Sequence, residues 1–327
     1  NLKISMRKLS AIEDPDSQFD ETDRLLAEYD RWGHQLKYEM TGNPALASSP
    51  AAKNVIDKIQ HARDRVLRGR ELLDTNKLVK RAFELANLAM FIAQTRPKSD
   101  RNPVWGGGSE FPQFDKAFEP VDLKTAPSQK GYWRPFQIAF LLMSLEGLVN
   151  DQSLDRDEVD LIWFPTGGGK TEAYLGVISF LLFYKRLIGE YDDGVTVMMR
   201  YTLRLLTAQQ FERATTLFCS MEYVRKQNIA ELGNKVFSIG LWVGLATSPN
   251  KRADAISQIK KMEKDPDGAG NPFILRRCPW CAAKFGAFKP KKSRSQVLGY
   301  VIEKGTVKYR CPDAACDFGN QQNPGMP

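Results

Sequence analysis

The stretch PTGGGKT at 165–171 has the residue types of a loop that binds nucleotide phosphates. It follows an apolar segment that predicts a buried strand and precedes a segment with the apolar spacing of a helix. Glycines let successive backbone N–H groups point at one phosphate, and the positive end of the following helix points at the same place. The predicted ATP-binding residues are Thr166, Gly167, Gly168, Gly169, Lys170 and Thr171. Lys170 and Thr171 are the predicted catalytic pair, because the lysine charge suits the terminal phosphates and the threonine hydroxyl suits Mg²⁺.

The flanks of this loop decide between a phosphate site and an incidental glycine turn. Phe164 stands where the full phosphate-loop pattern has glycine, which weakens the match. A strand before the loop and a helix after it are the context that the pattern requires, and they favour the phosphate site. With Pro165 before it and EAY after it, TGGGKT resembles motif I of superfamily 2 helicases.

Two further stretches resemble motifs of the same superfamily. The stretch YWRPFQ (132–137) resembles the adenine-contacting Q motif, which implies that Gln137 bonds the adenine edge and that Phe136 or Trp133 stacks on the ring. The alternative is a plain helix start with Pro135 at the first helical position.

The stretch MRYTLRLLTAQQ (199–210) resembles motif Ia, which grips a nucleic-acid backbone. The residues that this implies for phosphate contacts are Arg200, Thr202 and Arg204. The alternative is packing of the leucines with Arg204 in solvent. A weaker likeness to motif Ib lies in GLATSPN (244–250).

The acidic half of such a motor is missing after the loop. ATP hydrolysis needs a carboxylate that holds Mg²⁺ and a group that orients the attacking water. The acidic stretch 156–160 precedes the loop, EYDDG (190–194) is typical of a turn, and DPDGAGN (265–271) lacks the ligands of a calcium loop. We therefore expect this chain to bind nucleotide without hydrolysing it, as the first lobe of a motor cut before motif II. No second lobe and no arginine finger is identified.

Four of the five cysteines form two closely spaced pairs, CPWC and CPDAAC. Such spacings let two thiolates on a tight turn point at one ion, and two such turns complete a tetrahedron. The predicted ligands of a structural Zn²⁺ are Cys278, Cys281, Cys311 and Cys316. A disulfide pairing is the disfavoured alternative. The sequence GYVIEKGTVKYRC between the pairs predicts a hairpin that turns at EKGT, and Cys219 is predicted to be a buried helix residue.

Basic residues are concentrated around these cysteines. The loop FKPKKSRS supplies the predicted DNA-phosphate contacts Lys289, Lys291, Lys292 and Arg294. A solvated loop, or a surface for an acidic partner protein, is the alternative. The formal charge of the whole chain, +8, also favours a polyanion as partner.

The surrounding elements predict an α/β chain with a RecA-like first lobe, in which a parallel sheet has helices on both faces. The predicted strands are 159–165, 195–201 and 237–245, alternating with helices. The predicted domains are a helical N-terminal domain (1–96), a linker rich in Pro, Gly and Ser (97–130), the ATP-binding lobe (131–270) and an inserted zinc ribbon (271–327). In the first of these, 77–94 predicts an amphipathic helix with cap residues at 74–76.

A closer resemblance rests on five stretches in this order and spacing. They are GYWRPFQIAFLLMSLEGLV, DLIWFPTGGGKTEAYLG, VMMRYTLRLLTAQQFERA, SIGLWVG and NPFILRRCPWC. Together they resemble the DrmA-type helicase subunit of the bacterial DISARM anti-phage system. The resemblance implies a DNA-engaging ATPase in phage defence that works with a DrmB-type partner subunit on single-stranded or partly single-stranded DNA.

The predicted function is therefore an ATP-dependent DNA helicase or translocase, present as its N-terminal part. The alternative from another class is an ATP-regulated DNA-binding scaffold that does not separate strands; a small-molecule kinase is a distant third. The longest apolar run, 174–184, is shorter than the roughly 20 residues of a bilayer span, and we expect no secretion leader. We expect a cytoplasmic protein without membrane contact.

Overall fold

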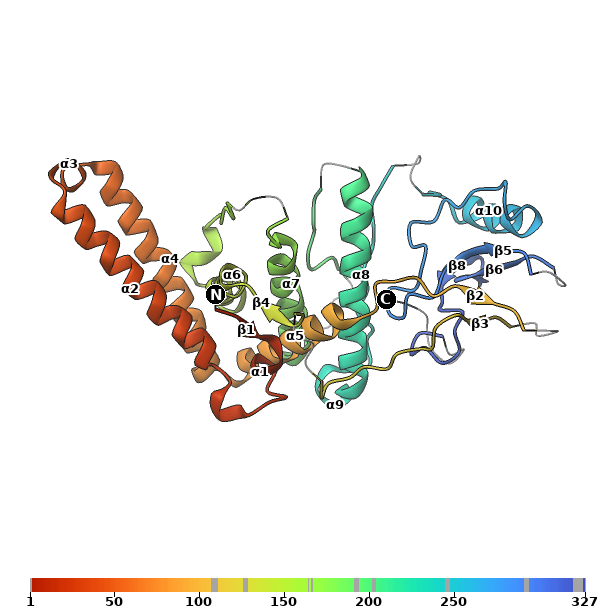
Figure 1. Ribbon diagram of the computed structural model, residues 1–327, viewed down its shortest axis with the longest axis horizontal. Coiled ribbons are helices and arrows are strands. Elements are labelled where there is room, and N and C mark those ends of the chain that lie inside the picture. Colours follow the sequence, from red (N-terminus) through yellow and green to blue (C-terminus); the bar gives the residue numbers. More distant parts are fainter. Residues whose placement is uncertain are drawn as a thin grey trace. The chain divides into compact units, whose positions relative to one another are not determined.

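The computed structural model describes residues 2–106, 111–125, 129–163, 165, 167–190, 194–201, 204–244, 248–290, 294–319 and 326, without the side chains of 204–207. These residues form two compact units (Figure 1). The first unit comprises Asn1–Gln94, Leu123–Met198 and Asn228–Gly233. The second unit comprises Thr95–Asp122, Met199–Gln227 and Asn234–Pro327. Residues of the predicted ATP-binding lobe occur in both units, and the domain boundaries proposed from the sequence stay a prediction.

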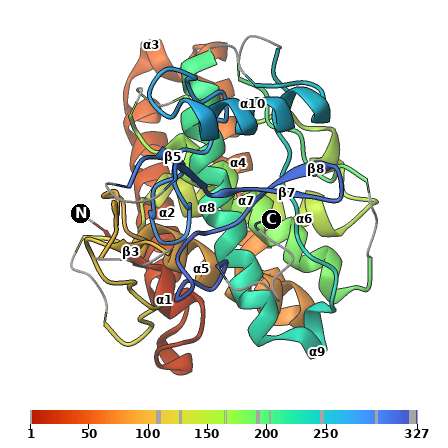
Figure 2. The ribbon, with the colours of Figure 1, turned by 90° about the vertical axis from the view of Figure 1, so that its right-hand side faces the viewer.

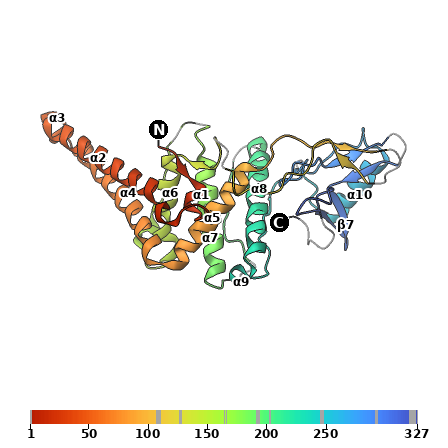
Figure 3. The ribbon, with the colours of Figure 1, turned by 60° about the horizontal axis from the view of Figure 1, so that its bottom comes forward.

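Helices build most of the first unit. They are α1 (Met6–Leu9), α2 (Asp20–Gly42), α3 (Pro44–Ala47), α4 (Pro50–Thr75), α5 (Lys77–Thr95), α6 (Pro135–Val149), α7 (Lys170–Leu187) and α9 (Ile229–Leu232), with short 3-10 turns at Pro15–Ser17 and Leu154–Asp157. One small antiparallel sheet pairs β1 (Ile4–Ser5) with β4 (Tyr132–Trp133). Figure 3 shows α2 and α4 as a long hairpin that extends away from α5, α6 and α7.

Helix α5 forms the core of this unit, as its apolar spacing predicts. The Asn76 side chain accepts hydrogen bonds from the Leu78 and Val79 amides, so the predicted cap is confirmed. Phe83, like most of the predicted apolar face, is fully buried. One polar contact crosses this core: the Trp133 indole N–H donates to the Asn87 side-chain oxygen at 2.7 Å.

Helices α4 and α6 lie close together at Gly69. A Cβ atom on Gly69 would lie 1.9 Å from the Leu142 carbonyl oxygen, a distance that no side chain can occupy. Glycine at this position therefore sets the separation of the two helices, and α6 carries the Q-motif residues at its start.

Replacing Gly69 with alanine is expected to push α4 and α6 apart and to lower the unfolding free energy by about 2–3 kcal/mol. Gly42, at the end of α2, is a matched control because a Cβ there meets nothing within 4 Å. Gly42→Ala is expected to leave stability unchanged or slightly raised. Denaturant unfolding followed by circular dichroism measures both, and equal effects of the two substitutions would contradict the close approach.

A buried arginine anchors the segment that leads into the phosphate loop. Arg65 of α4 is 3% exposed and donates to Asp160 at 2.6 Å, with longer contacts to Asp155 and Glu158. Arg68 adds a second bond to Asp155 at 2.9 Å. Asp155, Glu158 and Asp160 thus pair with α4, which gives these carboxylates a structural role.

The second unit combines two helices with short antiparallel hairpins. Its elements are α8 (Arg204–Gln227), α10 (Arg252–Lys264), β2 (Pro103–Val104) with β3 (Gln113–Phe114), β5 (Gly286–Phe288) with β6 (Gln296–Leu298), and β7 (Tyr300–Glu303) with β8 (Thr306–Tyr309). Lys304 and Gly305 turn the last hairpin with φ of 49° and 74°, so the hairpin and the EKGT turn that the sequence predicts are confirmed. Helix α10 packs on β5, β6 and β8 (Figure 2).

The predicted parallel sheet is not observed in the described part of the chain, where all four sheets are two-stranded and antiparallel. The described residues of 159–165, 195–201 and 237–245 belong to no strand. Several of their large side chains are exposed, such as Trp163 by 88% and Trp242 by 98%, whereas Phe237 at the start of the third segment is buried. Strands of a parallel sheet are buried on both faces and pair with neighbouring strands, and these segments pair with no strand among the described residues. The described chain is therefore a mixed helix and sheet protein. Among the residues described, no helix has the length and apolar character to cross a bilayer.

Candidate nucleotide and metal sites

The glycine-rich loop makes a tight turn that ends at the first residue of α7. Gly167 and Gly169 have φ of 81° and 87°, in the left-handed region that favours glycine, and Gly169 is the N-cap of the helix. The Gly168 amide donates to the Pro165 carbonyl at 3.1 Å, which closes the turn. None of the three glycines is buried. The loop therefore has an accessible backbone at a helix N-terminus, as an anion site requires.

The predicted catalytic pair occupies the first turn of α7. Lys170 is the first helical residue, and its ammonium donates to the Pro165 carbonyl at 3.3 Å, which holds the charge over the loop. Thr171 follows it and is half-buried. The predicted contact of Thr166 lies outside the described residues.

Two side chains of the Q-motif stretch form hydrogen bonds with carbonyl groups of the loop. The Gln137 amide nitrogen donates to the Gly169 carbonyl at 2.7 Å, and its oxygen accepts from the Arg134 amide at 2.8 Å. The Arg134 guanidinium donates to the Gly168 carbonyl at 2.7 Å. Both loop carbonyls are thus bonded to the start of α6. The motif likeness did not predict this role of Arg134; the available signal is its place directly before Pro135, the first residue of α6.

The structure corrects the predicted role of Trp133. Its side chain is 2% exposed, with its ring against Gly176 of α7, where a Cβ would lie 2.8 Å from the indole. A ring fixed between two helices in this way cannot stack on a nucleotide base. Phe136 is half-buried at the start of α6 and remains the predicted stacking residue. Gln137 is 3% exposed, so its amide positions the loop in this structure.

Replacing Gln137 with leucine is expected to weaken ATP binding about tenfold, because the Gly169 carbonyl loses its partner and the loop amides lose their orientation. Gln60→Leu, on an exposed position of α4, is the matched control and is expected to bind ATP like the wild type. Titration with a fluorescent ATP analogue measures both affinities. Equal affinity in wild type and Gln137→Leu would show that the loop holds its shape unaided.

The predicted nucleic-acid contacts are only partly described. Arg200 is exposed ahead of α8, and Lys289 and Arg294 are exposed at the ends of β5 and β6. Thr202, Lys291, Lys292 and the side chain of Arg204 lie outside the described residues, as does part of 244–250.

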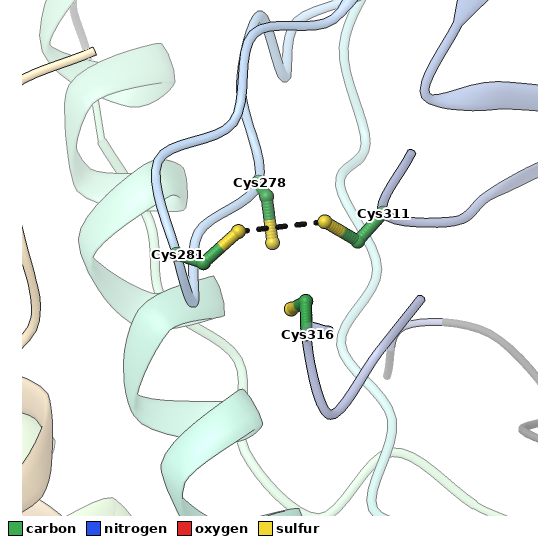
Figure 4. Close-up of side chains that lie close together, drawn as sticks. All are labelled: Cys278, Cys281, Cys311 and Cys316. Atoms are coloured by element: carbon green, nitrogen blue, oxygen red, sulfur yellow. Dashed lines mark hydrogen bonds between the residues drawn. The ribbon is translucent and has the colours of Figure 1, made fainter. Parts of the chain in front are cut away.

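The four predicted zinc ligands converge in the second unit. Cys278, Cys281, Cys311 and Cys316 are all buried, and their sulfur atoms lie within 4.8 Å of one another. Figure 4 shows the sulfurs turned toward a common centre, with 3.4 Å between those of Cys281 and Cys311. Ligands at about 2.3 Å in a tetrahedron are about 3.8 Å apart, so the cluster has the dimensions of a four-thiolate metal site.

Backbone turns place each cysteine pair. In the first pair, the Ala282 amide donates to the Cys278 carbonyl at 2.9 Å, and Ala282 takes a left-handed φ of 63°. In the second, the Cys316 amide donates to the Asp313 carbonyl at 3.1 Å, and the Asp313 carboxylate accepts from the Ala315 amide at 3.0 Å. The extra residues of the wider CPDAAC spacing are thus taken up in a local turn, and the ligands still converge.

The electrostatics of the cluster favour a cation at its centre. Burial raises the pKa of the Cys278 and Cys311 thiols, while hydrogen bonds from the other three cysteines lower the pKa of Cys281. Four thiolates in a buried site need a positive charge, which a divalent metal supplies. Two arginines with 4% exposure, Arg96 and Arg101, interact with these sulfurs. Buried cations beside the cluster suit the net negative charge of a zinc–tetrathiolate centre.

Aromatic packing joins the metal cluster to α8 within the second unit. The Trp280 ring is fully buried, with Tyr223 of α8 at 5.3 Å and Phe318 at 5.6 Å between ring centroids. Its indole N–H donates to Asp317 at 2.7 Å. Cys219 is buried in α8, as predicted, and all five cysteines are free thiols.

Comparison with known proteins gives one clear similarity. The chain is 33% identical over 332 residues to DISARM protein DrmA of Bacillus paralicheniformis, and the alignment covers 98% of the chain. It spans 28% of that relative's length. No protein-family model matches the chain. The resemblance to a DrmA-type subunit that the motifs predict is confirmed, and it extends over nearly all of the chain.

Proposed function

We propose that this chain is the nucleotide-binding part of an ATP-dependent DNA helicase or translocase in a bacterial anti-phage defence system. The observation that carries the proposal is the glycine turn that ends at the N-terminus of α7, with Lys170 and Thr171 in the first helical turn. Its similarity to DISARM protein DrmA supports the biological context. A DrmB-type subunit is the proposed protein partner.

In this proposal, the loop amides and the start of α7 bind the ATP phosphates, and Lys170 neutralises charge on the terminal ones. Arg134 and Gln137 hold the carbonyls of Gly168 and Gly169, so that these oxygens stay away from the bound anion. The Thr171 hydroxyl would hold Mg²⁺, whose charge would offset that of the phosphates. Phe136 is proposed to stack on adenine.

The exposed apolar segments support a RecA-like lobe that is completed elsewhere in the protein. Trp163 and Trp242 lie in two of the three segments with strand-like sequences, and large apolar side chains at such exposure need a cover. We propose that strands from the remaining part of a DrmA-type protein pair with these segments and form the parallel sheet. The same part would supply motif II and the arginine finger, for which this sequence has no candidates.

Single-stranded or partly single-stranded DNA is the proposed polynucleotide. Contacts with its phosphates are proposed for Arg200, Thr202, Arg204, Lys289, Lys291, Lys292 and Arg294, and the cysteine cluster is proposed to hold Zn²⁺ in a structural role. With four protein ligands, the centre has no open position for catalysis.

The rival proposal is a scaffold whose nucleotide site only tightens a DNA complex. The absence of an acidic motif after the loop in this sequence favours it for the chain by itself. The deciding experiment measures ATP turnover and strand separation by the full-length protein, with Lys170→Ala as the inactive reference. DNA binding without any turnover in the full-length protein would favour the scaffold.

A further inference from the structure

Helix α10 has a basic surface that no motif accounts for. Five cations lie in or directly before it: Lys251, Arg252, Lys260, Lys261 and Lys264. All five are exposed, and none forms an ion pair within the part of the chain that the structure describes. Two acids, Asp254 and Glu263, share the helix, so the segment 251–264 has a net charge of +3 (five cations less two anions).

The packing of α10 fixes which side of the helix carries this charge. Ile259 and Met262 are 2% exposed and point into the second unit, where α10 packs on β5, β6 and β8. At 100° per residue, Lys260, Lys261 and Lys264 lie on the opposite side. Ala253 and Ser257, both exposed, share that side, and their small side chains leave room for a backbone to approach.

Helix stability explains only part of this charge. Lysines in the last turn, such as Lys261 and Lys264, do complement the helix dipole. Lys251 and Arg252 stand at the N-terminal end, where a cation opposes the dipole. The first turn also holds one acid, Asp254, which is fewer than the two cations at this end.

We propose that α10 binds the phosphate backbone of double-stranded DNA, without reading its sequence. Lysine ammonium groups suit phosphates as point charges. Residues 252–264 contain no aromatic side chain on which an unpaired base could stack, which disfavours single-stranded DNA as the ligand of this surface. This inference deepens the proposed function, on which it rests for the choice of DNA, and it adds a duplex contact to the single-strand contacts proposed above.

The test compares duplex binding by the full-length protein and its variant K260Q/K261Q/K264Q, without nucleotide. Glutamine keeps helix propensity and avoids repulsion at the helix C-terminus. Binding of a labelled 20-base-pair duplex is followed by fluorescence anisotropy from about 50 to 300 mM salt. We expect the variant to bind at least tenfold more weakly at about 100 mM salt and to lose about 2–3 units of the log–log salt slope, since each phosphate contact contributes about 0.9.

The matched control removes the same charge elsewhere. Lys37, Lys53 and Lys58 are exposed on the α2–α4 hairpin and form no ion pair among the described residues. K37Q/K53Q/K58Q is expected to bind duplex like the wild type, and K260R/K261R/K264R is expected to retain binding. Equal losses of duplex affinity in the two glutamine variants would show that net charge alone determines binding, and this would overturn the proposal. Unchanged duplex binding in K260Q/K261Q/K264Q would also overturn it.

Two further arms separate the possible outcomes. A single strand of the same length is expected to lose less affinity than the duplex in K260Q/K261Q/K264Q, and a larger loss for the single strand or for duplex RNA would overturn the assignment to duplex DNA. ATP turnover is measured in parallel. If duplex binding depends on α10 but the protein does not turn over ATP, this inference stands and the motor proposal is refuted. If the protein turns over ATP but duplex binding does not depend on α10, the motor proposal stands and this inference is refuted.

Discussion

Replacing Lys170 with alanine is expected to reduce ATP turnover by the full-length protein about 100-fold or more. The Lys170 ammonium lies at the start of α7 and bonds to the Pro165 carbonyl, so it is held within the loop that would receive the phosphates. No other described lysine or arginine lies in the first turn of this helix. Without this charge, the terminal phosphates lose the cation that offsets their developing charge.

DNA binding is expected to survive in Lys170→Ala, because the proposed DNA contacts lie on other elements. Lys185 is a matched control: it lies in the last turn of the same helix and pairs with Glu190 at 2.9 Å. Lys185→Ala is expected to turn over ATP at the wild-type rate. Full turnover in Lys170→Ala would place the ATP site elsewhere, and a joint loss of turnover and DNA binding would indicate a folding defect.

Local structure around the phosphate loop follows from the sequence because its causes are local. Three features depend only on neighbours within a few residues: the glycines at left-handed positions, the start of the helix at Lys170 and the cap at Asn76. The hairpin turn at Lys304 and Gly305 belongs to the same class. Cysteine convergence was predictable as well, since thiol spacing alone limits how four ligands can meet.

The pairing of strands that lie far apart in the sequence was not predicted correctly. The segment 159–163 has the composition of a central strand, yet its pairing depends on neighbours that no local pattern specifies, and Val159 is 96% exposed. The ion-pair partners of Arg65 could not be predicted either, because a charged residue within a helix is normally solvent-exposed. Trp133 was one of two candidates for base stacking, and its burial depends on contacts with Asn87 of α5 and Gly176 of α7, far from it in the sequence.

The basic surface of α10 also could not be predicted from the sequence alone. Lysines at 260, 261 and 264 are visible in the sequence, but their shared orientation matters only once Ile259 and Met262 are known to be buried. Their lack of ion-pair partners in the described chain is a property of the folded second unit, where Asp100 and Glu303 pair with other cations.

Replacing Cys311 with serine is expected to remove bound zinc and to destabilise the second unit. One zinc per chain is expected in the wild type, falling to a small fraction in Cys311→Ser, because a structural site with three thiolates loses most of its affinity. The unfolding temperature of this unit is expected to fall by roughly 10 °C or more, since metal binding contributes directly to folding. Atomic emission measures the metal, and calorimetry with and without chelator measures the transition.

Cys219 provides the control for this prediction. It is as buried as the four ligands, at 0% exposure, but it lies in α8 outside the cluster. Cys219→Ala is expected to keep full zinc content and to cost about 1 kcal/mol through the small cavity that it leaves. Because Trp280 packs between the cysteine pairs and Tyr223 of α8, loss of the metal in Cys311→Ser is also expected to change tryptophan fluorescence. Two results would contradict a structural metal centre and leave the four thiols as packing residues. One is full zinc content in Cys311→Ser. The other is a metal-free wild type whose unfolding temperature does not change when zinc is added.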